Sequence, residues 1–237
     1  MNIAAQFDWT QELEKTVVKS LATSFGLDFL LFEDKCGGNV DTVHNARQGI
    51  YASEAERQKF QQRPEYDSSY YHSADGYVQR GRSDKMNHQA GNLQDSYRQQ
   101  NMAAYEHRDL DHVISAKEIH NDAGRVLAGL DGLDLANTDG NLASTHRTIN
   151  RSKQDKSVDD FLVYLQTAIP QQEVKLKKDK QRLFKIPRNT PEQQHKYRIL
   201  EDDIRKDQEK IETLKSVDTE GMRQKDRSAR AGYDGTI

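Results

Sequence analysis

The chain has 237 residues, of which 34% are hydrophobic and 31% are charged, and its formal net charge is −3. This composition supplies too little apolar material for one large core, and the slight negative charge is unlike that of a dedicated nucleic-acid coat protein. The single cysteine, Cys36, excludes an intramolecular disulfide. The sequence shows neither a secretory leader at its start nor an apolar run of membrane-spanning length, so we expect a cytoplasmic protein that does not bind membranes.

Residues 1–104 are expected to form a helical and mixed region. Apolar residues at helical spacing predict an amphipathic helix from Thr10 to Ser24. Leu27 to Glu33 is typical of a strand, and a Gly-rich turn after it makes Val40 to His44 a candidate return strand. Ser53, followed three residues later by an acidic residue, predicts the capped start of a short helix.

The stretch from residue 61 to residue 84 is polar and rich in tyrosine. Its tyrosines, with Arg80 and Arg82 close by, could stack on bases and hold phosphates. We prefer the simpler interpretation of a long loop that is anchored by its tyrosines, because nothing fixes their spacing. A helix over residues 83–102 is expected to follow it.

The most informative part of the chain is residues 105–169. Its beginning alternates like a short strand, which would place Leu110 and His112 on one face and Asp111 on the other. A polar loop follows, and from about Ser144 the composition is that of an exposed, basic helix start. A carboxylate beside a histidine, followed by a segment that offers a side-chain amide, suits metal-assisted hydrolysis of phosphodiesters.

Each of these side chains has a chemical role to offer. The carboxylate of Asp111 is a hard oxygen ligand for Mg²⁺ or Mn²⁺, and Asn150 can supply a second, neutral oxygen. His112 has a side chain suited to take a proton from an attacking water molecule. A helix beside such a site would use Arg147, Arg151 and Lys153 for contacts with the nucleic-acid backbone.

This stretch resembles the HNH, or ββα-metal (His-Me finger), endonucleases, in the Asp-His…Asn…Asn version found in RNA-guided DNA nucleases and in endonuclease VII-type resolvases. The match covers about a fifth of the chain. Residues 109–114 match the family's first strand, Asn141 its central asparagine, and residues 150–153 the helix with the last metal ligand. The resemblance implies a small ββα-metal core within a mostly helical α+β protein.

The resemblance also implies roles. His112 would be the general base, Asp111 and Asn150 would hold one Mg²⁺ or Mn²⁺ ion, and Asn141 would pin the loop that orients His112. Many members bind a structural zinc through two Cys-x-x-Cys pairs. This chain has one cysteine, so no structural zinc is expected. Two further ligands stay open: Asp109, on the face of Asp111, and His146, four residues before Asn150.

The C-terminal third is strongly charged and helical in pattern. An apolar helical stripe is expected to end at Pro170, and residues 170–218 predict an antiparallel helical hairpin. Its second helix begins with Thr190 as cap and Pro191 at the first helical position. The thin apolar seam of this hairpin predicts packing on another surface, in a homodimer or on a partner protein. Residues 219–237 are expected to be a flexible tail.

Three functions follow from these patterns. The first is a metal-dependent HNH endonuclease that nicks or cleaves DNA. The family resemblance alone suggests a phage, plasmid or anti-phage defence setting for it. The second is a helical scaffold or adaptor that binds nucleic acid or protein without catalysis, and the third is an RNA-cleaving toxin that uses the same site. Neither the form of the substrate nor the role of residues 1–104 follows from the sequence.

Overall fold

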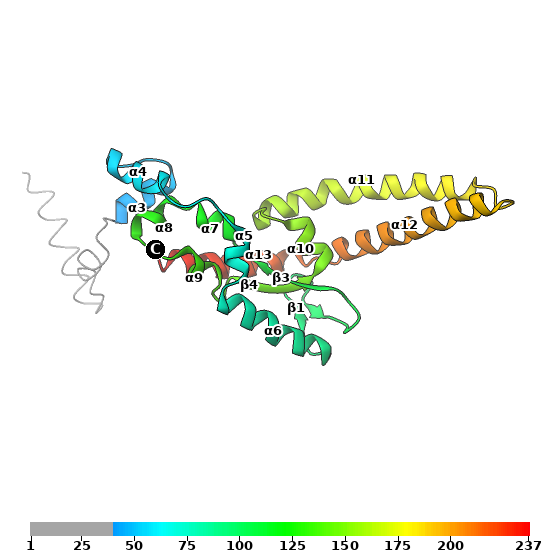
Figure 1. Ribbon diagram of the computed structural model, residues 1–237, viewed down its shortest axis with the longest axis horizontal. Helices are drawn as coiled ribbons and strands as arrows, with labels where there is room; N and C mark the ends of the chain where they lie inside the picture. The colour runs from blue at the N-terminus through cyan, green and yellow to red at the C-terminus, as the bar shows by residue number, and fades with distance from the viewer. Residues whose placement is uncertain (1–39) are drawn as a thin grey trace, which may run out of the picture.

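The computed structural model describes residues 40–237, and they form a mostly helical α+β structure with a small antiparallel strand component (Figure 1). The predicted helix from Thr10 to Ser24 and strand from Leu27 to Glu33 lie outside the described residues. Along the described part, no helix combines the length and apolar character needed to cross a bilayer.

The first described elements are four helices: α3 (Val40–Arg47), α4 (Glu54–Gln61), α5 (Ser68–His72) and α6 (Asp75–Gln89). The return strand predicted at Val40 to His44 is therefore wrong, because these residues begin α3. Ser53 caps α4 as predicted, its side chain accepting from the backbone N–H of Glu56. The expected long loop instead contains α5 and most of α6, so the helix predicted at residues 83–102 begins and ends earlier.

Among residues 40–237, four strands form two small antiparallel pairs. Strand β1 (Gln94–Asp95) pairs with β2 (Gln100–Asn101), and β3 (Arg108–His112) pairs with β4 (Leu142–His146). Helix α10 (Arg147–Lys153) follows β4 directly and packs on both strands of the second pair. Ser144, expected to open a helix, therefore lies within a strand instead.

The segment between β3 and β4 contains three short helices: α7 (Ala116–His120), α8 (Ala123–Ala128) and α9 (Gly132–Ala136). Each begins at a polar side chain that accepts backbone N–H groups, namely Ser115, Asp122 and Asp131. These caps explain the polar composition of the segment, which carries no long apolar run.

A long antiparallel hairpin projects from the body of the molecule (Figure 1). It consists of α11 (Val158–Phe184) and α12 (Pro191–Lys215), and Thr190 and Gln193 form a capping box at the start of α12, as the sequence predicts. The prediction that the first helix ends at Pro170 is wrong, since α11 continues through it. A proline removes one backbone donor and usually kinks a helix, but packing along the hairpin keeps the helix continuous.

The C-terminal segment is a helix, α13 (Thr219–Asp234), and the prediction of a flexible tail is wrong. Its apolar side chains are few but buried, with Met222 fully inaccessible to solvent. It returns from the base of the hairpin into the body (Figure 1). Core residues from several elements meet there, including Val113, Ile149, Phe161 and Leu214.

Candidate active site

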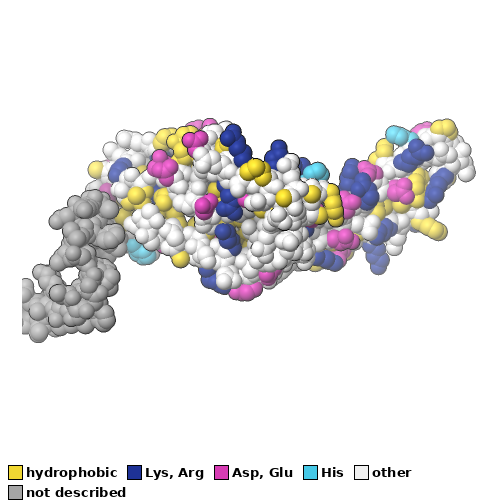
Figure 2. Space-filling model, turned by 90° about the horizontal axis from the view of Figure 1, so that it is seen from below, with side chains coloured by type: hydrophobic (Ala, Val, Ile, Leu, Met, Phe, Trp, Pro, Cys, Tyr) yellow, Lys and Arg dark blue, Asp and Glu magenta, His cyan; other side chains and the backbone are white. Residues whose placement is uncertain are grey.

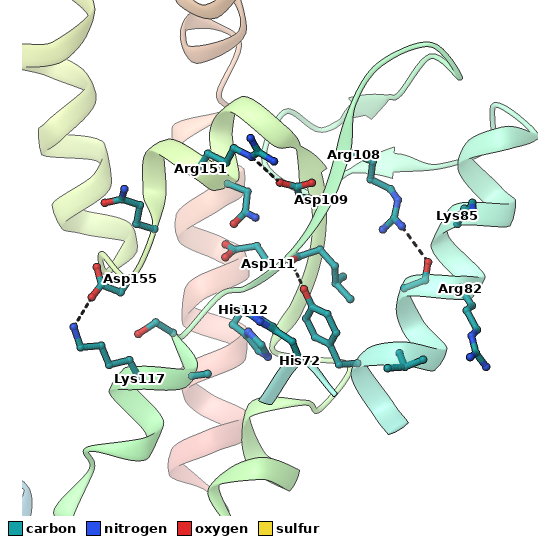
Figure 3. Close-up of a pocket in the computed structure, with 18 of the residues that line it drawn as sticks. His72, Arg82, Lys85, Arg108, Asp109, Asp111, His112, Lys117, Arg151 and Asp155 are labelled. Atoms are coloured by element: carbon teal, nitrogen blue, oxygen red, sulfur yellow. Dashed lines mark hydrogen bonds and ion pairs between the residues drawn. The ribbon is translucent and has the colours of Figure 1, made fainter. Parts of the chain in front are cut away.

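Helices α6, α7 and α10 and strand β3 surround a cavity of about 820 Å³ in the body (Figure 3). Five of the residues singled out in the sequence line it: Asp109, Asp111, His112, Asn150 and Arg151. The strand and helix come together because β4 leads directly into α10, which packs back across β3. Asp111 and His112 thus share one cavity, although the alternation of the strand predicts opposite faces.

The carboxylate of Asp111 is buried and held on one oxygen. Its Oδ2 accepts a hydrogen bond of 2.6 Å from the hydroxyl of Tyr97 and lies 2.9 Å from Nζ of Lys153. Lys153 is itself fully buried and donates to the carbonyl oxygen of His112 at 2.9 Å. Within residues 40–237, no hydrogen bond to Oδ1 of Asp111 is formed.

This position corrects the role expected of Lys153. The side chain was predicted at the surface, in contact with phosphate, but its relative exposure is 0%. A buried ammonium needs a nearby carboxylate, and Asp111 supplies it. Lys153 therefore neutralises and positions Asp111, and it ties α10 to the end of β3.

His112 has a defined tautomer because Asn137 holds it. The Oδ1 atom of Asn137 lies 3.0 Å from Nε2 of His112. The amide nitrogen of Asn137 donates to the carbonyl oxygens of Tyr71 and Leu133, at 3.2 and 2.9 Å, which fixes the orientation of the amide. Since an oxygen faces Nε2, Nε2 carries the hydrogen and Nδ1 keeps a free lone pair.

The ring of His112 packs in a cluster with two other rings, which also contact each other at 4.8 Å between centroids. Its centroid lies 5.5 Å from that of His72 and 5.2 Å from that of Tyr77. Burial lowers the pKa of His112 below its usual value, while the Asn137 hydrogen bond and the charge of Asp111 act in the opposite direction. The net shift favours the neutral imidazole, which is the form that can accept a proton.

Two tyrosines of the 61–84 stretch serve as anchors, although the stretch is largely helical where a loop was predicted and Tyr70 is exposed. The hydroxyl of Tyr77 donates to the carbonyl oxygen of Leu110 at 2.8 Å, and Tyr71 bonds to the ring of His120 at 3.0 Å. Burial and the charge of Asp111 raise the pKa of Tyr77 to about 12, so it stays protonated and remains a donor. These contacts place α5 and α6 against the wall of the cavity.

Asn141 fixes the segment that follows β3. Its side chain is buried, and it accepts from the backbone N–H of Ile114 at 2.7 Å while donating to the carbonyl oxygens of Ile114 and Ala136. Asn141 therefore ties the start of the segment to its end, between Ile114 and Ala136. The ring of His112, however, is contacted by Asn137, a residue that the sequence analysis missed.

Of the two arginines of α10, Arg151 lines the rim of the cavity, whereas Arg147 lies outside the lining and shares Asp109 with it. Nε of Arg147 is 3.2 Å from one oxygen of Asp109, and Nε of Arg151 is 3.6 Å from the other. Arg151 remains largely exposed, so its remaining N–H groups face solvent. Asp109 thus positions two guanidinium groups next to Asn150, which is half-buried and lines the cavity.

His146, considered as a further metal ligand, is not among the described residues that line the cavity. It ends β4 and caps α10, its Nδ1 accepting from the backbone N–H of Thr148 at 3.1 Å. The prediction that it shares a helix face with Asn150 is therefore wrong. Burial lowers the pKa of His146, consistent with a neutral ring that serves as a cap.

Basic side chains surround the cavity more densely than α10 alone predicts (Figure 3). Arg82 and Lys85 reach it from α6, and both are exposed without an ion-pair partner among residues 40–237. Arg108 is held by the hydroxyl of Ser144 and the carbonyl oxygen of Gly81, both at 3.1 Å. The rim of the cavity is therefore positively charged, while Asp111 lies deeper.

The donor set of this cavity is sparse. Within residues 40–237, no three His, Cys, Asp or Glu side chains are grouped as a metal site would require. Asp111 offers one carboxylate oxygen and Asn150 one amide oxygen. Mg²⁺ keeps several waters and takes few protein ligands, so such a pair fits Mg²⁺ or Mn²⁺ better than a cation that needs a full protein cage.

No family model, curated protein or solved structure matches the chain in a comparison with known proteins.

Proposed function

We propose that this protein is a metal-dependent endonuclease of the HNH type that hydrolyses DNA phosphodiester bonds at the cavity beside β3. The observation that carries the proposal is the contact of Nε2 of His112 with Oδ1 of Asn137, in a cavity that Asp111 and Asn150 also line. This contact leaves Nδ1 as the ring nitrogen with the lone pair. The succession of two antiparallel strands and a helix supports the proposal, since β3 supplies Asp111 and His112, and α10, which follows β4 directly, supplies Asn150.

The chemistry starts at His112. Its Nδ1 takes a proton from a water molecule, and the resulting hydroxide oxygen forms a bond to the phosphorus while the bond to the leaving oxygen breaks. The leaving oxygen receives a proton from solvent. A base with a pKa below its usual value is deprotonated at neutral pH and is ready for this step.

Asp111 and Asn150 would hold the divalent ion, Mg²⁺ or Mn²⁺. When bound, such an ion stabilises negative charge on the phosphate and on the leaving oxygen. Tyr97 and Lys153 fix the other oxygen of Asp111, so the carboxylate cannot rotate away from the cavity. Arg151, Arg82 and Lys85 at the rim would contact the phosphates on either side of the scissile bond.

The test is cleavage of supercoiled plasmid with Mg²⁺, Mn²⁺ or EDTA. We expect metal-dependent nicking or linearisation by the unmodified protein, and a loss of at least about a hundredfold in His112→Ala and Asn150→Ala. His107→Ala, an exposed histidine outside the cavity lining, is the matched control and should cut normally. Equal cutting by all variants, or none with any metal, would refute the proposal. A single-stranded RNA substrate tests the RNA-cleaving alternative.

One observation favours a second candidate, a nucleic-acid-binding module without catalysis. The ammonium of Lys153 already lies 2.9 Å from Asp111, and it offsets the charge that would attract a metal ion. In that case DNA binding would be the same in EDTA and in His112→Ala, and no cleavage product would form. The plasmid experiment, run beside a binding assay, separates the two functions.

A further inference from the structure

The far end of the hairpin carries an excess of positive charge. We define the hairpin tip as residues 177–198, from the last two turns of α11 to the first two turns of α12. It contains two acidic residues, Asp179 and Glu192, and eight basic ones: Lys177, Lys178, Lys180, Arg182, Lys185, Arg188, Lys196 and Arg198. The tip thus has a net charge of +6 in a chain whose net charge is −3.

These charges are available for binding. All eight basic side chains of the hairpin tip are exposed. Within residues 40–237, Lys196 alone among them forms an ion pair, with Glu192. Nearer the body the hairpin is different, because Arg205, Lys206 and Lys215 each pair with an acidic residue. Figure 2 shows Lys and Arg side chains along the projecting hairpin.

The tip also presents a shaped surface. A shallow groove along α11 is lined by Lys177, Lys180 and Lys185 together with the ring of Phe184, which is 92% exposed. In the connection between the two helices, the guanidinium of Arg188 lies over the ring of Tyr197 of α12, 3.7 Å from its centroid. Lysines that follow one another along a helix, with an exposed aromatic ring between them, match a chain of phosphates with adjoining bases or sugars.

We propose that the hairpin tip is a second nucleic-acid-binding surface, which holds the phosphate backbone of DNA away from the cavity. Charge complementarity argues for this partner, since unpaired lysines favour a polyanion and the rest of the chain is acidic. About 20 residues of α11 separate Val158 from the tip, a distance of roughly 30 Å along a helix. That is close to one turn of duplex DNA.

The inference extends the proposed function, but the binding does not depend on cleavage. The test measures fluorescence anisotropy of a labelled duplex of about 30 base pairs, roughly 100 Å long, in EDTA. The tip variant is Lys177→Gln/Lys180→Gln/Lys185→Gln. The control is Arg205→Gln/Lys206→Gln/Lys215→Gln, which removes the same charge nearer the body. Circular dichroism checks that both variants remain folded.

We expect the tip variant to bind the duplex at least about tenfold more weakly at about 50 mM salt. The slope of the logarithm of its binding constant against the logarithm of the salt concentration should be smaller in magnitude by about two to three. The control should stay within about threefold of the unmodified protein. Equal binding by the two variants overturns the inference. So does a tip variant that loses only the binding of polyglutamate or of anionic vesicles, since the partner would then be an acidic protein or a membrane.

The outcomes also separate this inference from the proposed function. Plasmid cleavage that persists while the tip variant binds like the control would leave the nuclease proposal in place and refute the tip. A protein that never cuts, but whose tip variant loses duplex binding, would refute the nuclease proposal and leave the inference about the hairpin tip in place.

Discussion

The Oδ1 atom of Asn137 lies 3.0 Å from Nε2 of His112, and this contact leaves Nδ1 as the nitrogen without a proton in the neutral imidazole. The carbonyl oxygens of Tyr71 and Leu133 prevent the amide from turning over. Asn137 is thus a positioning residue, and its contribution can be separated from that of His112 itself.

Replacing Asn137 by aspartate should shift the pH profile of cleavage. In the unmodified protein burial lowers the pKa of His112, so the rate should be constant above about pH 6.5 and fall as His112 becomes protonated below it. A carboxylate at position 137 stabilises the imidazolium and should move this limb to higher pH by about one unit or more. The measurement is the cleavage rate between about pH 5 and 9. Asn101→Asp, on the exposed strand β2, should leave the profile unchanged; a shift in both variants would contradict the assignment.

The stability of the protein should decrease in mild acid. Burial lowers the pKa of four histidines: His72, His112, His120 and His146. In the unfolded chain they bind protons near pH 6.5, whereas in the folded state they resist protonation, so the unfolded state gains protons first as the pH falls. The free energy of unfolding should therefore be highest above about pH 6.5 and decline below it. Urea titrations at about pH 7.5 and 5.5 measure the loss. His112→Gln should make this loss of unfolding free energy smaller, whereas His195→Gln, at an exposed position, should leave the loss unchanged.

Lys153→Met should lower the free energy of unfolding by about 3–5 kcal/mol, because it leaves the carboxylate of Asp111 buried without its ammonium. Arg151→Met, on the exposed face of the same helix, should change it by less than about 0.5 kcal/mol. Urea unfolding gives both values. Adding Asp111→Asn to Lys153→Met should recover part of the loss, and simple additivity of the two substitutions would contradict a direct coupling.

Met222→Ala should destabilise the protein by about 2–5 kcal/mol, because the side chain of Met222 is fully buried in the core. Met86→Ala is the matched control, since Met86 is 65% exposed on α6. Its effect should be within about 0.5 kcal/mol. Thermal or urea unfolding distinguishes the two, and equal small effects would mean that α13 is not part of the cooperative unit.

The sequence predicts well those features that depend on neighbours along the chain. The capped helix starts at Ser53 and Thr190 are local arrangements and are confirmed. The strand with Asp111 and His112 is confirmed as an element, whereas the opposite faces that alternation predicts for these two residues are not found. These signals require no knowledge of the rest of the fold.

Features that depend on distant parts of the chain are missed. Asn137 lies in a polar segment where many residues could cap or turn, and its contact with His112 arises when α9, which Asn137 ends, packs on α5 and α7. Lys153 has the composition of a surface residue, and its burial depends on Asp111, from another element. The C-terminal helix α13 is mostly charged, so its few apolar residues carry too weak a pattern to outweigh a tail-like composition.

Helix α13 also contacts two elements that lie far from it in the sequence. Asp234 accepts a hydrogen bond from Arg47, at the end of α3, at 2.8 Å, and Tyr233 donates one to Asp122, the cap of α8, at 2.9 Å. These partners are separated by more than a hundred residues, whereas the hairpin of α11 and α12 is held by contacts close in sequence. As the chain leaves the ribosome, we expect the hairpin to form early and the body around His112 to stay incomplete until α13 follows. The site of the proposed cleavage would then be complete only after the whole of α13 has emerged.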